Sequence, residues 1–385
     1  MQIKEVKTPA DVRAFLAVPK TIYAADPAWI QPLDKDIEEV FDKEKNKAFR
    51  GGGEAVRWIL EDHSGKPVGR IAAFVNKKYK AEQPTGGIGF WECPNDPSAA
   101  HLLFDTAKAW LEARGMEAMD GPINFGERDR WWGLQVAGFQ PPLYCMNYNP
   151  PYYQALMEGY GFQTYFQQIC FALDPKARLQ EKFYARHAEL AKDPAFSARR
   201  IEKDKLDAYA ADFTKVYNAA WAGHGGGKTL EERTVRKMFQ SMKPVMDAEI
   251  IWFVYHNEEP IAMWVNLPDL NQWFGKLKGK FGLLQKLQFL FYKTFTPNTR
   301  FVGLVFGVVP AFQGKGVDAY MIVEAAKTIQ VKAHYSEYEM QWIGDFNPKM
   351  INIAESLGTH RSRVLSTYRY LFDRNKEFKR HPLLS

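Results

Sequence analysis

Cysteine is scarce in this chain, and its placement argues against two kinds of stabilising site. The 385 residues include three cysteines, Cys93, Cys145 and Cys170, and no two of them form a CxxC pair. A structural zinc site needs closely spaced ligands, and a disulfide framework uses an even number of cysteines. We therefore expect three buried, unpaired thiols in a reducing compartment.

Long apolar runs and familiar catalytic signatures are also missing. No stretch reaches about 18 uncharged apolar residues, so the sequence predicts no membrane-spanning helix, and the first residues lack the apolar core of a signal peptide. The histidines form no HExxH pattern, and no nucleophile motif surrounds a serine or cysteine. We expect a cytoplasmic protein with neither a metal centre nor a covalent acyl-enzyme.

The composition is that of a folded protein with two domains. Hydrophobic residues make up 46%, charged residues 25% and aromatic residues 15%, and 385 residues correspond to about two domains of ordinary size. The net charge of +6 is spread along the chain. It suits an anionic partner, such as a nucleotide-containing cofactor or an anionic membrane. No nucleic-acid-binding motif is present, so we expect no nucleic-acid partner.

The chain contains two copies of one structural plan. Each copy has a β-hairpin, a long amphipathic helix, an Asn-Pro segment that starts a shorter helix, a glycine and a final strand. In the two copies the hairpins span residues 57–76 and 250–266, the long helices 99–114 and 317–333, and the final strands 165–173 and 364–372. We predict an N-terminal domain over residues 1–173, a helical linker over 174–200 and a C-terminal domain over 201–385.

A glycine-rich turn in the second copy predicts a site for a pyrophosphate. A strand runs into the sequence Q-G-K-G and then into a helix, which leaves several backbone N–H groups unpaired at the positive end of the helix dipole. Glycines let the backbone approach the ligand closely. The predicted cofactor-binding residues here are Gln313, Gly314, Lys315, Gly316, Val317, Asp318 and Ala319.

This segment resembles the cofactor motif of the GNAT superfamily of N-acyltransferases, a strand ending in V-x-P followed by Q/R-x-x-G-x-G/A. Asp318 stands where the superfamily has its last small residue. The resemblance implies two tandem GNAT domains of the α+β or α/β class, each a mixed sheet flanked by helices. Acetyl-CoA or a longer acyl-CoA would be the co-substrate. Asn347 and Gly358 match a second element of the superfamily, in which Ala354 replaces the tyrosine that protonates the leaving thiolate.

The whole chain resembles a bacterial family of tandem GNAT-like proteins. The shared segments are Y-x-x-D-P-x-W at residues 23–29, V-G-R-I-A at 68–72, G-P-x-N at 121–124 and Y-N-x-x-Y-Y at 148–153. Relatives include ceramide-synthase-type acyltransferases, which join a fatty acyl group to a long-chain amine. The first copy lacks the Q-G-x-G turn and carries an insertion over residues 121–148, so we interpret it as a degenerate domain that does not bind CoA.

The resemblance implies an N-acyltransferase that moves an acyl group from a CoA thioester to an amine. Backbone N–H groups of Val308 and Val309 would polarise the thioester carbonyl, and Asn347 would complete the cofactor site. The candidate general bases are Glu339, Glu127 and Asp129. The candidate acceptor-binding residues are Tyr217, Trp221, His224 and Arg128. Each of these residues could instead be an ordinary surface charge or core aromatic.

Two other functions fit the same residues. An inactive acyl-CoA-binding protein would explain Ala354 and Asp318. A Fem-type aminoacyl-tRNA-dependent transferase also uses tandem GNAT domains, although the Q-G-K-G turn favours CoA. The sequence leaves the acyl length, the acceptor and the oligomeric state open.

A basic and apolar stretch at residues 273–296 contains five lysines and no acidic residue. Leucines and phenylalanines recur in it near helical spacing, although three glycines weaken its first part. A basic amphipathic helix can rest on an anionic membrane, so one prediction is contact with the inner face of the membrane. The other is a helix packed on the core whose lysines face water.

Overall fold

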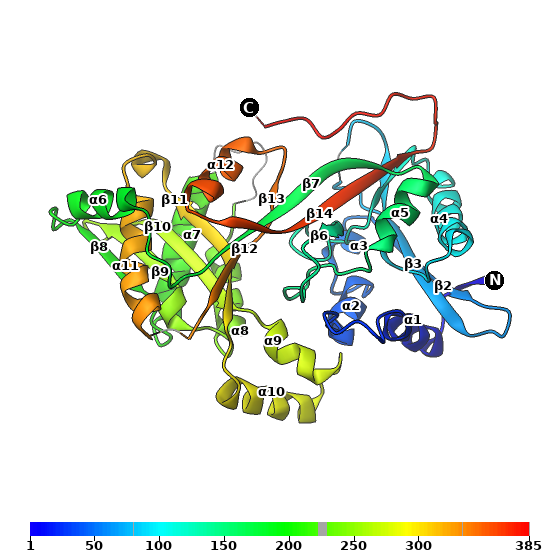
Figure 1. Cartoon of the computed structure of the whole chain (residues 1–385), viewed down its shortest axis with the longest axis horizontal. Helices are drawn as coiled ribbons and strands as arrows, with labels where there is room; N and C mark the ends of the chain where they lie inside the picture. Colours follow the sequence, from blue (N-terminus) through cyan, green and yellow to red (C-terminus); the bar gives the residue numbers. More distant parts are fainter. Residues whose placement is uncertain (80, 222–228, 333, 385) are drawn as a thin grey trace.

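The computed structural model describes residues 1–79, 81–221, 229–332 and 334–384 of the chain (Figure 1). We call residues 1–173 the first half and residues 174–385 the second half. The elements of the first half are β1 (Gln2–Glu5), α1 (Pro9–Ile22), α2 (Asp34–Val40), α3 (Lys47–Arg50), β2 (Glu54–Glu61), β3 (Pro67–Val75), β4 (Thr85–Glu92), α4 (Pro97–Glu112), β5 (Ala118–Gly121), β6 (Leu134–Ala137), α5 (Tyr152–Tyr160) and β7 (Gln163–Leu173).

The second half repeats this order with helix α6 added before its first strand and a helical segment added between its third and fourth strands. Its elements are α6 (Glu181–Leu190), β8 (Phe196–Arg200), α7 (Leu206–Trp221), α8 (Glu232–Met242), η1 (Ala248–Ile250), β9 (Trp252–His256), β10 (Glu259–Pro268), α9 (Asn271–Phe274), η2 (Gly275–Leu277), α10 (Leu283–Phe295), β11 (Arg300–Val308), η3 (Pro310–Phe312), α11 (Val317–Lys332), β12 (Glu337–Met340), β13 (Ile343–Gly344), α12 (Pro348–Ser356) and β14 (His360–Leu371). The predicted hairpins, long helices and closing strands are all present.

Strand pairing joins the two halves into one mixed sheet. In the described part of the chain its main path runs β1-β2-β3-β4-β5-β14-β7-β12-β11-β10-β9-β8. Read from either end, this order is five strands of one half followed by the last strand of the other half. The sheet therefore has the approximate two-fold symmetry expected of two copies of one plan.

The last strands of the two halves are exchanged. β14, at the end of the second half, pairs antiparallel with β5 of the first half, and β7, at the end of the first half, pairs antiparallel with β12 of the second. β7 and β14 also pair with each other along most of their length (Figure 1). Each half thus supplies a strand that the other half needs to extend its sheet.

The predicted helical linker contains more than a spacer. Residues 174–200 form helix α6 and then strand β8, and β8 pairs antiparallel with β9 at the edge of the sheet of the second half. The charged helical period was visible in the sequence, but Phe196 and Ala198 pack against the core of the second half. The predicted domain boundaries stay a prediction, because strand pairing is continuous across them.

Local sequence explains where the paired helices begin. α4 starts after Asp96, whose side chain accepts a hydrogen bond from the backbone N–H of Ser98 at 2.8 Å. α12 starts after Asn347, whose side chain accepts one from the N–H of Met350 at 3.2 Å. In both cases proline follows at the first helical position, where its missing N–H costs nothing.

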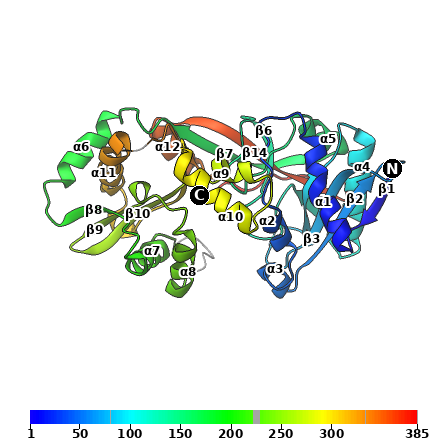
Figure 2. The same ribbon diagram turned by 90° about the horizontal axis from the view of Figure 1, so that it is seen from below.

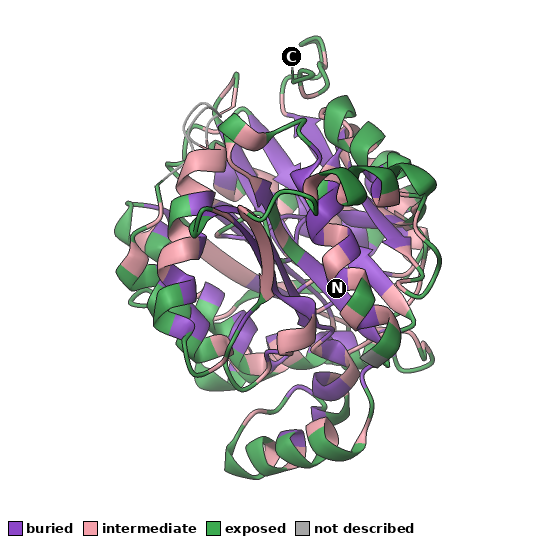
Figure 3. Cartoon of the chain, turned by 90° about the vertical axis from the view of Figure 1, so that its left-hand side faces the viewer, coloured by how far each residue is buried: buried purple, intermediate pink, exposed green. Residues whose placement is uncertain are grey.

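Helices cover both faces of the sheet. In the second half, α7 and α8 lie on one side and α11 on the other (Figure 2). The core of each half lies between the sheet and its helices, and the buried residues follow the strands in Figure 3. Cys93, Cys145 and Cys170 are buried free thiols, as the sequence predicted.

We predict that the halves depend on each other for folding, because each lacks a central strand without its partner. When residues 1–173 and 174–385 are produced separately, neither should show a cooperative thermal transition. Produced together, they should copurify as an equimolar complex. Size-exclusion chromatography and thermal unfolding of each piece check this, and two independently folded monomers would contradict it.

Candidate functional site

The main cavity of the second half lies where two parallel strands part. β11 and β12 pair from Arg300 and Glu337 to Gly303 and Met340, and the pairing then stops. A cavity of about 550 Å³ follows, within the range typical of small-molecule sites. Its lining is mostly apolar and includes Trp221, Leu304, Phe306, Trp342, Ile353 and Leu357. We call it the apolar cavity.

A β-bulge in β11 lies beside this cavity. Val305 pairs with Val265 and Gly303 with Asn266, so Leu304 is an extra residue in β11. A bulge redirects the backbone and leaves its extra residue out of the ladder. Beyond Gly303, the edge of β11 that faced β12 has no recorded pairing in the described strands, so its backbone N–H groups are available to a ligand.

The predicted role of Val309 is wrong. Its N–H donates to the carbonyl of Ile261 at 2.9 Å, so it is already satisfied within the sheet. The carbonyl of Val308 accepts from Nε2 of Gln313 at 2.9 Å. These two contacts hold the end of β11 in place.

The glycine-rich turn lies between β11 and α11, as predicted. Gly314 and Gly316 have φ values of 72° and 85°, which favour glycine. A β-carbon on Gly314 would meet nothing within 4 Å, so this part of the turn is open. The side chain of Lys315 is exposed. Asp318 and Asn347 both line the apolar cavity, which connects the turn with the cavity.

Helix α6 covers one side of this turn, which the sequence did not reveal. A β-carbon on Gly316 would lie 3.4 Å from the side chain of Arg186. Phe183 packs against Ala319 and Val323. Val317 and Ala319 are consequently buried, and of the predicted turn only the part around Gly314 and Asp318 faces outward. The apolar spacing of Leu179 and Phe183 in a charged segment was the available signal.

Tyr338 provides a hydroxyl at the point where the strands part. It lines the apolar cavity, and its oxygen accepts a hydrogen bond from Nε1 of Trp264 at 3.1 Å. Burial raises the pKa of Tyr338, so the hydroxyl stays protonated at neutral pH. Ala354 also lines the cavity, packed in a cluster with Ile169 and Phe171. Sequence reasoning missed Tyr338.

Glu339 is buried away from the apolar cavity. Its neighbours Tyr338 and Met340 line the cavity, and successive residues of a strand point to opposite faces. The carboxylate accepts from Nε of Arg363 at 2.6 Å and from Nη2 at 2.9 Å, and Ser362 donates at 2.8 Å. This placement does not support the predicted role of Glu339 as a general base.

The four predicted acceptor residues do not lie together. Trp221 lines the apolar cavity. Tyr217 stacks on Trp221 with ring centroids 4.6 Å apart and supports it from behind. His224 lies outside the described residues. Arg128 belongs to the junction between the halves, which is described below.

The corresponding opening in the first half is filled by the insertion. β4 and β5 also pair in parallel, from Thr85 and Ala118 to Gly87 and Asp120. The N–H of Ile123 then donates to the carbonyl of Ile88 at 2.8 Å, and the aromatic residues of the insertion pack into a buried cluster with Phe74. The space that corresponds to the apolar cavity of the second half is taken by the chain itself.

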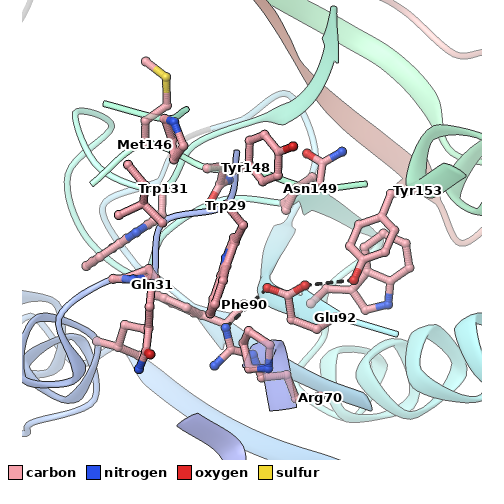
Figure 4. Close-up of a pocket in the computed structure, with 18 of the residues that line it drawn as sticks. Trp29, Gln31, Arg70, Phe90, Glu92, Trp131, Met146, Tyr148, Asn149 and Tyr153 are labelled. Carbon is pink, nitrogen blue, oxygen red and sulfur yellow. Dashed lines mark hydrogen bonds and ion pairs between the residues drawn. The ribbon is translucent and has the colours of Figure 1, made fainter. Parts of the chain in front are cut away.

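A smaller cavity remains in the first half, and it is lined by buried polar groups (Figure 4). We call it the polar cavity; its volume is about 60 Å³. One oxygen of Glu92 accepts from the hydroxyls of Tyr23 at 2.7 Å and Tyr153 at 2.8 Å. The other oxygen lies 3.4 Å from Nη2 of Arg70. Nε of Arg70 is buried without a hydrogen-bond partner among the described residues.

The polar cavity is lined by two carboxyl groups, Glu92 and Asp34, and by the buried guanidinium of Arg70. Burial raises the pKa of Glu92, although Arg70 and the two tyrosine hydroxyls oppose that shift. Asp34 also lines the cavity, and burial raises its pKa too. Trp29 and Trp131 also line the cavity, and Trp29 stacks on Tyr23 with ring centroids 4.9 Å apart. The segments at residues 23–29, 68–72 and 148–153 each contribute a residue to this site.

A narrow pocket of about 10 Å³ lies next to both cavities. It shares Trp131 and Met146 with the polar cavity and Gln341 and Trp342 with the apolar cavity. Arg128 and Asp129 of the insertion line it, and the guanidinium of Arg128 lies 5.5 Å from the ring centroid of Trp132. The insertion therefore brings two predicted residues to the junction, whereas Glu127 is exposed and lines none of the three pockets.

Comparisons with known proteins agree with this geometry. Across 381 residues the chain is 29% identical to a protein named bacterial ceramide synthase from Caulobacter vibrioides, with 96% of this chain and 97% of that protein covered. Protein YghO of Escherichia coli is 25% identical, with 90% of each chain covered. No family model matches the sequence.

Two solved structures are similar in fold. A tandem GNAT protein from the clavulanic acid biosynthesis pathway superposes with a TM-score of 0.52 at 11% identity, covering 96% of this chain and 99% of that one. The glucosamine N-acetyltransferase region of a fungal multi-domain enzyme gives a TM-score of 0.53 at 12% identity, covering 96% of this chain and 38% of that one. The chain has the tandem GNAT fold.

A substitution at Glu339 separates a structural role from a catalytic one. In Glu339→Gln the buried Arg363 loses its ion-pair partner, so we expect the free energy of unfolding to fall by about 3 kcal/mol in urea titrations. The matched control is Glu355→Gln, which breaks an exposed pair with Arg361 and should cost less than about 1 kcal/mol. If Glu339→Gln kept the free energy of unfolding of the wild type but lost turnover, Glu339 would again be the candidate general base.

Proposed function

We propose that this protein is an acyl-CoA-dependent N-acyltransferase that transfers a long acyl chain to an amine. The observation that carries the proposal is the large apolar cavity between the parted strands β11 and β12, with an open glycine turn and helix N-terminus at its edge. The tandem GNAT fold supports an acyltransferase in general. The cavity supports the choice of a long acyl chain.

In this proposal each part of the acyl-CoA has a place. The pyrophosphate accepts hydrogen bonds from backbone N–H groups between Gly314 and Asp318, with Lys315 as a nearby positive charge. The pantetheine arm lies along the unpaired edge of β11, where it can hydrogen-bond to the backbone as a strand would. The acyl chain lies against the apolar lining of the cavity, which favours long chains because more apolar surface leaves water.

The reaction needs a neutral amine, a polarised carbonyl and a proton donor for the leaving group. The amine nitrogen attacks the thioester carbon, the C–S bond breaks, and the proton released by the amine balances the one taken up by the CoA thiolate. Backbone N–H groups at the bulge stabilise the developing oxyanion. The hydroxyl of Tyr338 takes the place of the tyrosine that Ala354 replaces, and it supplies the proton to the thiolate.

The amine acceptor binds from the side of the first half. Its ammonium group is held in the polar cavity by Glu92, Asp34 and the rings of Trp29 and Trp131, and Glu92 accepts a proton from it. To reach the thioester the nitrogen has to cross the junction, where the narrow pocket of about 10 Å³ must widen to admit it. A long-chain amino alcohol has a head group small enough for this cavity, and the similarity to a protein named bacterial ceramide synthase supports that class of acceptor.

Calorimetric titration with acyl-CoA tests the donor site. Wild-type protein should bind palmitoyl-CoA at least about tenfold more tightly than acetyl-CoA. Gly314→Asp places a negative charge on the open turn and should weaken both ligands at least about tenfold. Ala326→Phe fills part of the cavity and should weaken palmitoyl-CoA alone.

The chain offers a matched control for each variant. Gly115 has φ 73° and open space around its β-carbon position, like Gly314, so Gly115→Asp introduces the same residue away from the turn. Val331→Phe adds a ring to an exposed position of the same helix as Ala326. Absence of binding by every CoA ligand would refute the proposal, and binding without turnover of any amine would leave an acyl-CoA-binding protein.

Glu92→Gln tests the acceptor site. With palmitoyl-CoA and a long-chain amino alcohol, kcat/KM for the amine should fall at least about tenfold, since a charged hydrogen bond and the proton acceptor are both removed. The dissociation constant for palmitoyl-CoA should stay unchanged, because the donor lies in the other cavity.

The control is Glu158→Gln, which also removes a carboxylate that accepts a tyrosine hydroxyl, that of Tyr368 at 2.9 Å, outside all of these pockets. Thermal unfolding of both variants separates loss of fold from loss of function. If a folded Glu92→Gln protein keeps its kcat/KM for the amine, the polar cavity does not hold the acceptor.

A further inference from the structure

Helix α10 exposes large apolar side chains along one face. Leu283, Leu284, Leu287, Leu290, Phe291 and Phe295 follow helical spacing, and between 53% and 79% of each side chain is exposed. Only Phe289 among the helix residues is buried. A helix on the surface of a soluble protein normally turns such residues inward. A contiguous exposed apolar face of this kind marks a surface that binds another molecule or a membrane.

Five lysines lie in the same segment as this apolar face. Lys276, Lys278, Lys280 and Lys286 are exposed, and Nζ of the half-buried Lys293 donates to the carbonyl of Pro244. Residues 273–296 contain no aspartate or glutamate to balance these charges. The partner must accordingly be both apolar and anionic, a combination that the surface of an anionic lipid bilayer presents.

The segment α9–η2–α10 projects from the body of the molecule but is firmly anchored at its base (Figures 1 and 3). Phe289 packs with Leu33 of the first half and with Trp273. Nδ2 of Asn271 donates to the carbonyl of Pro142 at 2.8 Å, and the N–H of Asp34 donates to the carbonyl of Gly279 at 2.7 Å. The exposed face therefore has a defined orientation.

The base of the projecting segment also contacts two residues that line the polar cavity. Asp34 and Pro142, which contact the projecting segment, both line that cavity. Figure 2 views the molecule from the side on which α10 lies, in front of the junction between the halves. A surface bound by α10 would therefore lie on the same side of the molecule as these two residues.

We propose that α10 docks this protein onto an anionic lipid bilayer. The helix lies in the interfacial plane, with its leucines and phenylalanines among the acyl chains and its lysines near the anionic headgroups. No helix in the described ranges is long and apolar enough to cross a bilayer, so this contact is peripheral. Docking is independent of which acyl-CoA the enzyme uses.

A second copy of this chain is the main alternative partner. Two copies joined through α10 would bring their lysines together without intervening carboxylates, and like charges at short range repel. An anionic membrane instead attracts them. The charge pattern thus favours the bilayer.

Vesicle co-sedimentation tests the proposal with full-length protein. The wild-type protein should bind vesicles made of equal parts of phosphatidylcholine and phosphatidylglycerol. It should bind vesicles of pure phosphatidylcholine at least about tenfold more weakly. Two triple variants should each weaken vesicle binding at least about tenfold: Leu284→Ser/Leu287→Ser/Phe291→Ser and Lys278→Gln/Lys280→Gln/Lys286→Gln. In the lysine variant, vesicle binding should also lose most of its dependence on salt concentration. The matched basic control is Lys43→Gln/Lys66→Gln/Lys192→Gln, which removes the same charge from exposed sites elsewhere.

A fluorescent label gives a second readout. Because the three native cysteines are buried, Leu287→Cys can be labelled selectively with an environment-sensitive maleimide. The emission of this label should shift to the blue when anionic vesicles are added. The same label on Val331→Cys, the control, should show no shift. Palmitoyl-CoA affinity in detergent-free solution should be unchanged in all variants, which separates this test from that of the donor site. The proposal would be overturned if the wild-type protein did not bind anionic vesicles, or if the lysine control lost as much vesicle binding as the α10 lysine variant. A dimer that depends on α10 in size-exclusion chromatography would also overturn it.

Discussion

The exchange of β7 and β14 is the interaction on which the rest of the structure depends. Each strand extends the sheet of the opposite half, so the halves cannot separate without leaving backbone hydrogen-bonding groups unpaired. The exchange fixes the distance and angle between the two openings at β4–β5 and β11–β12. The narrow pocket shares lining residues with both the apolar cavity and the polar cavity.

One architecture has been used in two ways. In the second half the parted parallel strands leave a large apolar cavity next to a glycine turn. In the first half the insertion fills the equivalent space with Phe125, Trp131 and Trp132 and leaves a small cavity lined by Glu92 and Arg70. The two cavities, to which we assign the donor and the acceptor in our proposal, thus have opposite chemical character although they lie in two copies of one plan.

The projecting segment adds a third element to this arrangement. It is an insertion between β10 and β11 whose base packs against both halves, and its outer face is apolar and basic. An interfacial helix beside the polar cavity would place that cavity near lipid molecules. This arrangement fits an enzyme whose amine acceptor has one polar end and one long apolar end.

The sequence by itself determined the repeat, the main strands and helices, the Q-G-K-G turn and the basic character of residues 273–296, because these follow from local periodicity, glycine spacing and charge. The structure brings Trp221, Asp318 and Asn347 to one cavity, although the sequence had assigned Trp221 to the acceptor and the other two residues to the cofactor. Only the tertiary structure decided the strand exchange, since β7 and β14 have the same pattern whichever partner they take. It likewise showed that Glu339 forms a buried ion pair with Arg363 and that the N–H of Val309 donates to the carbonyl of Ile261. Tyr338, Glu92 and Arg70 come together from distant strands and loops, and no spacing along the chain records contacts of that kind.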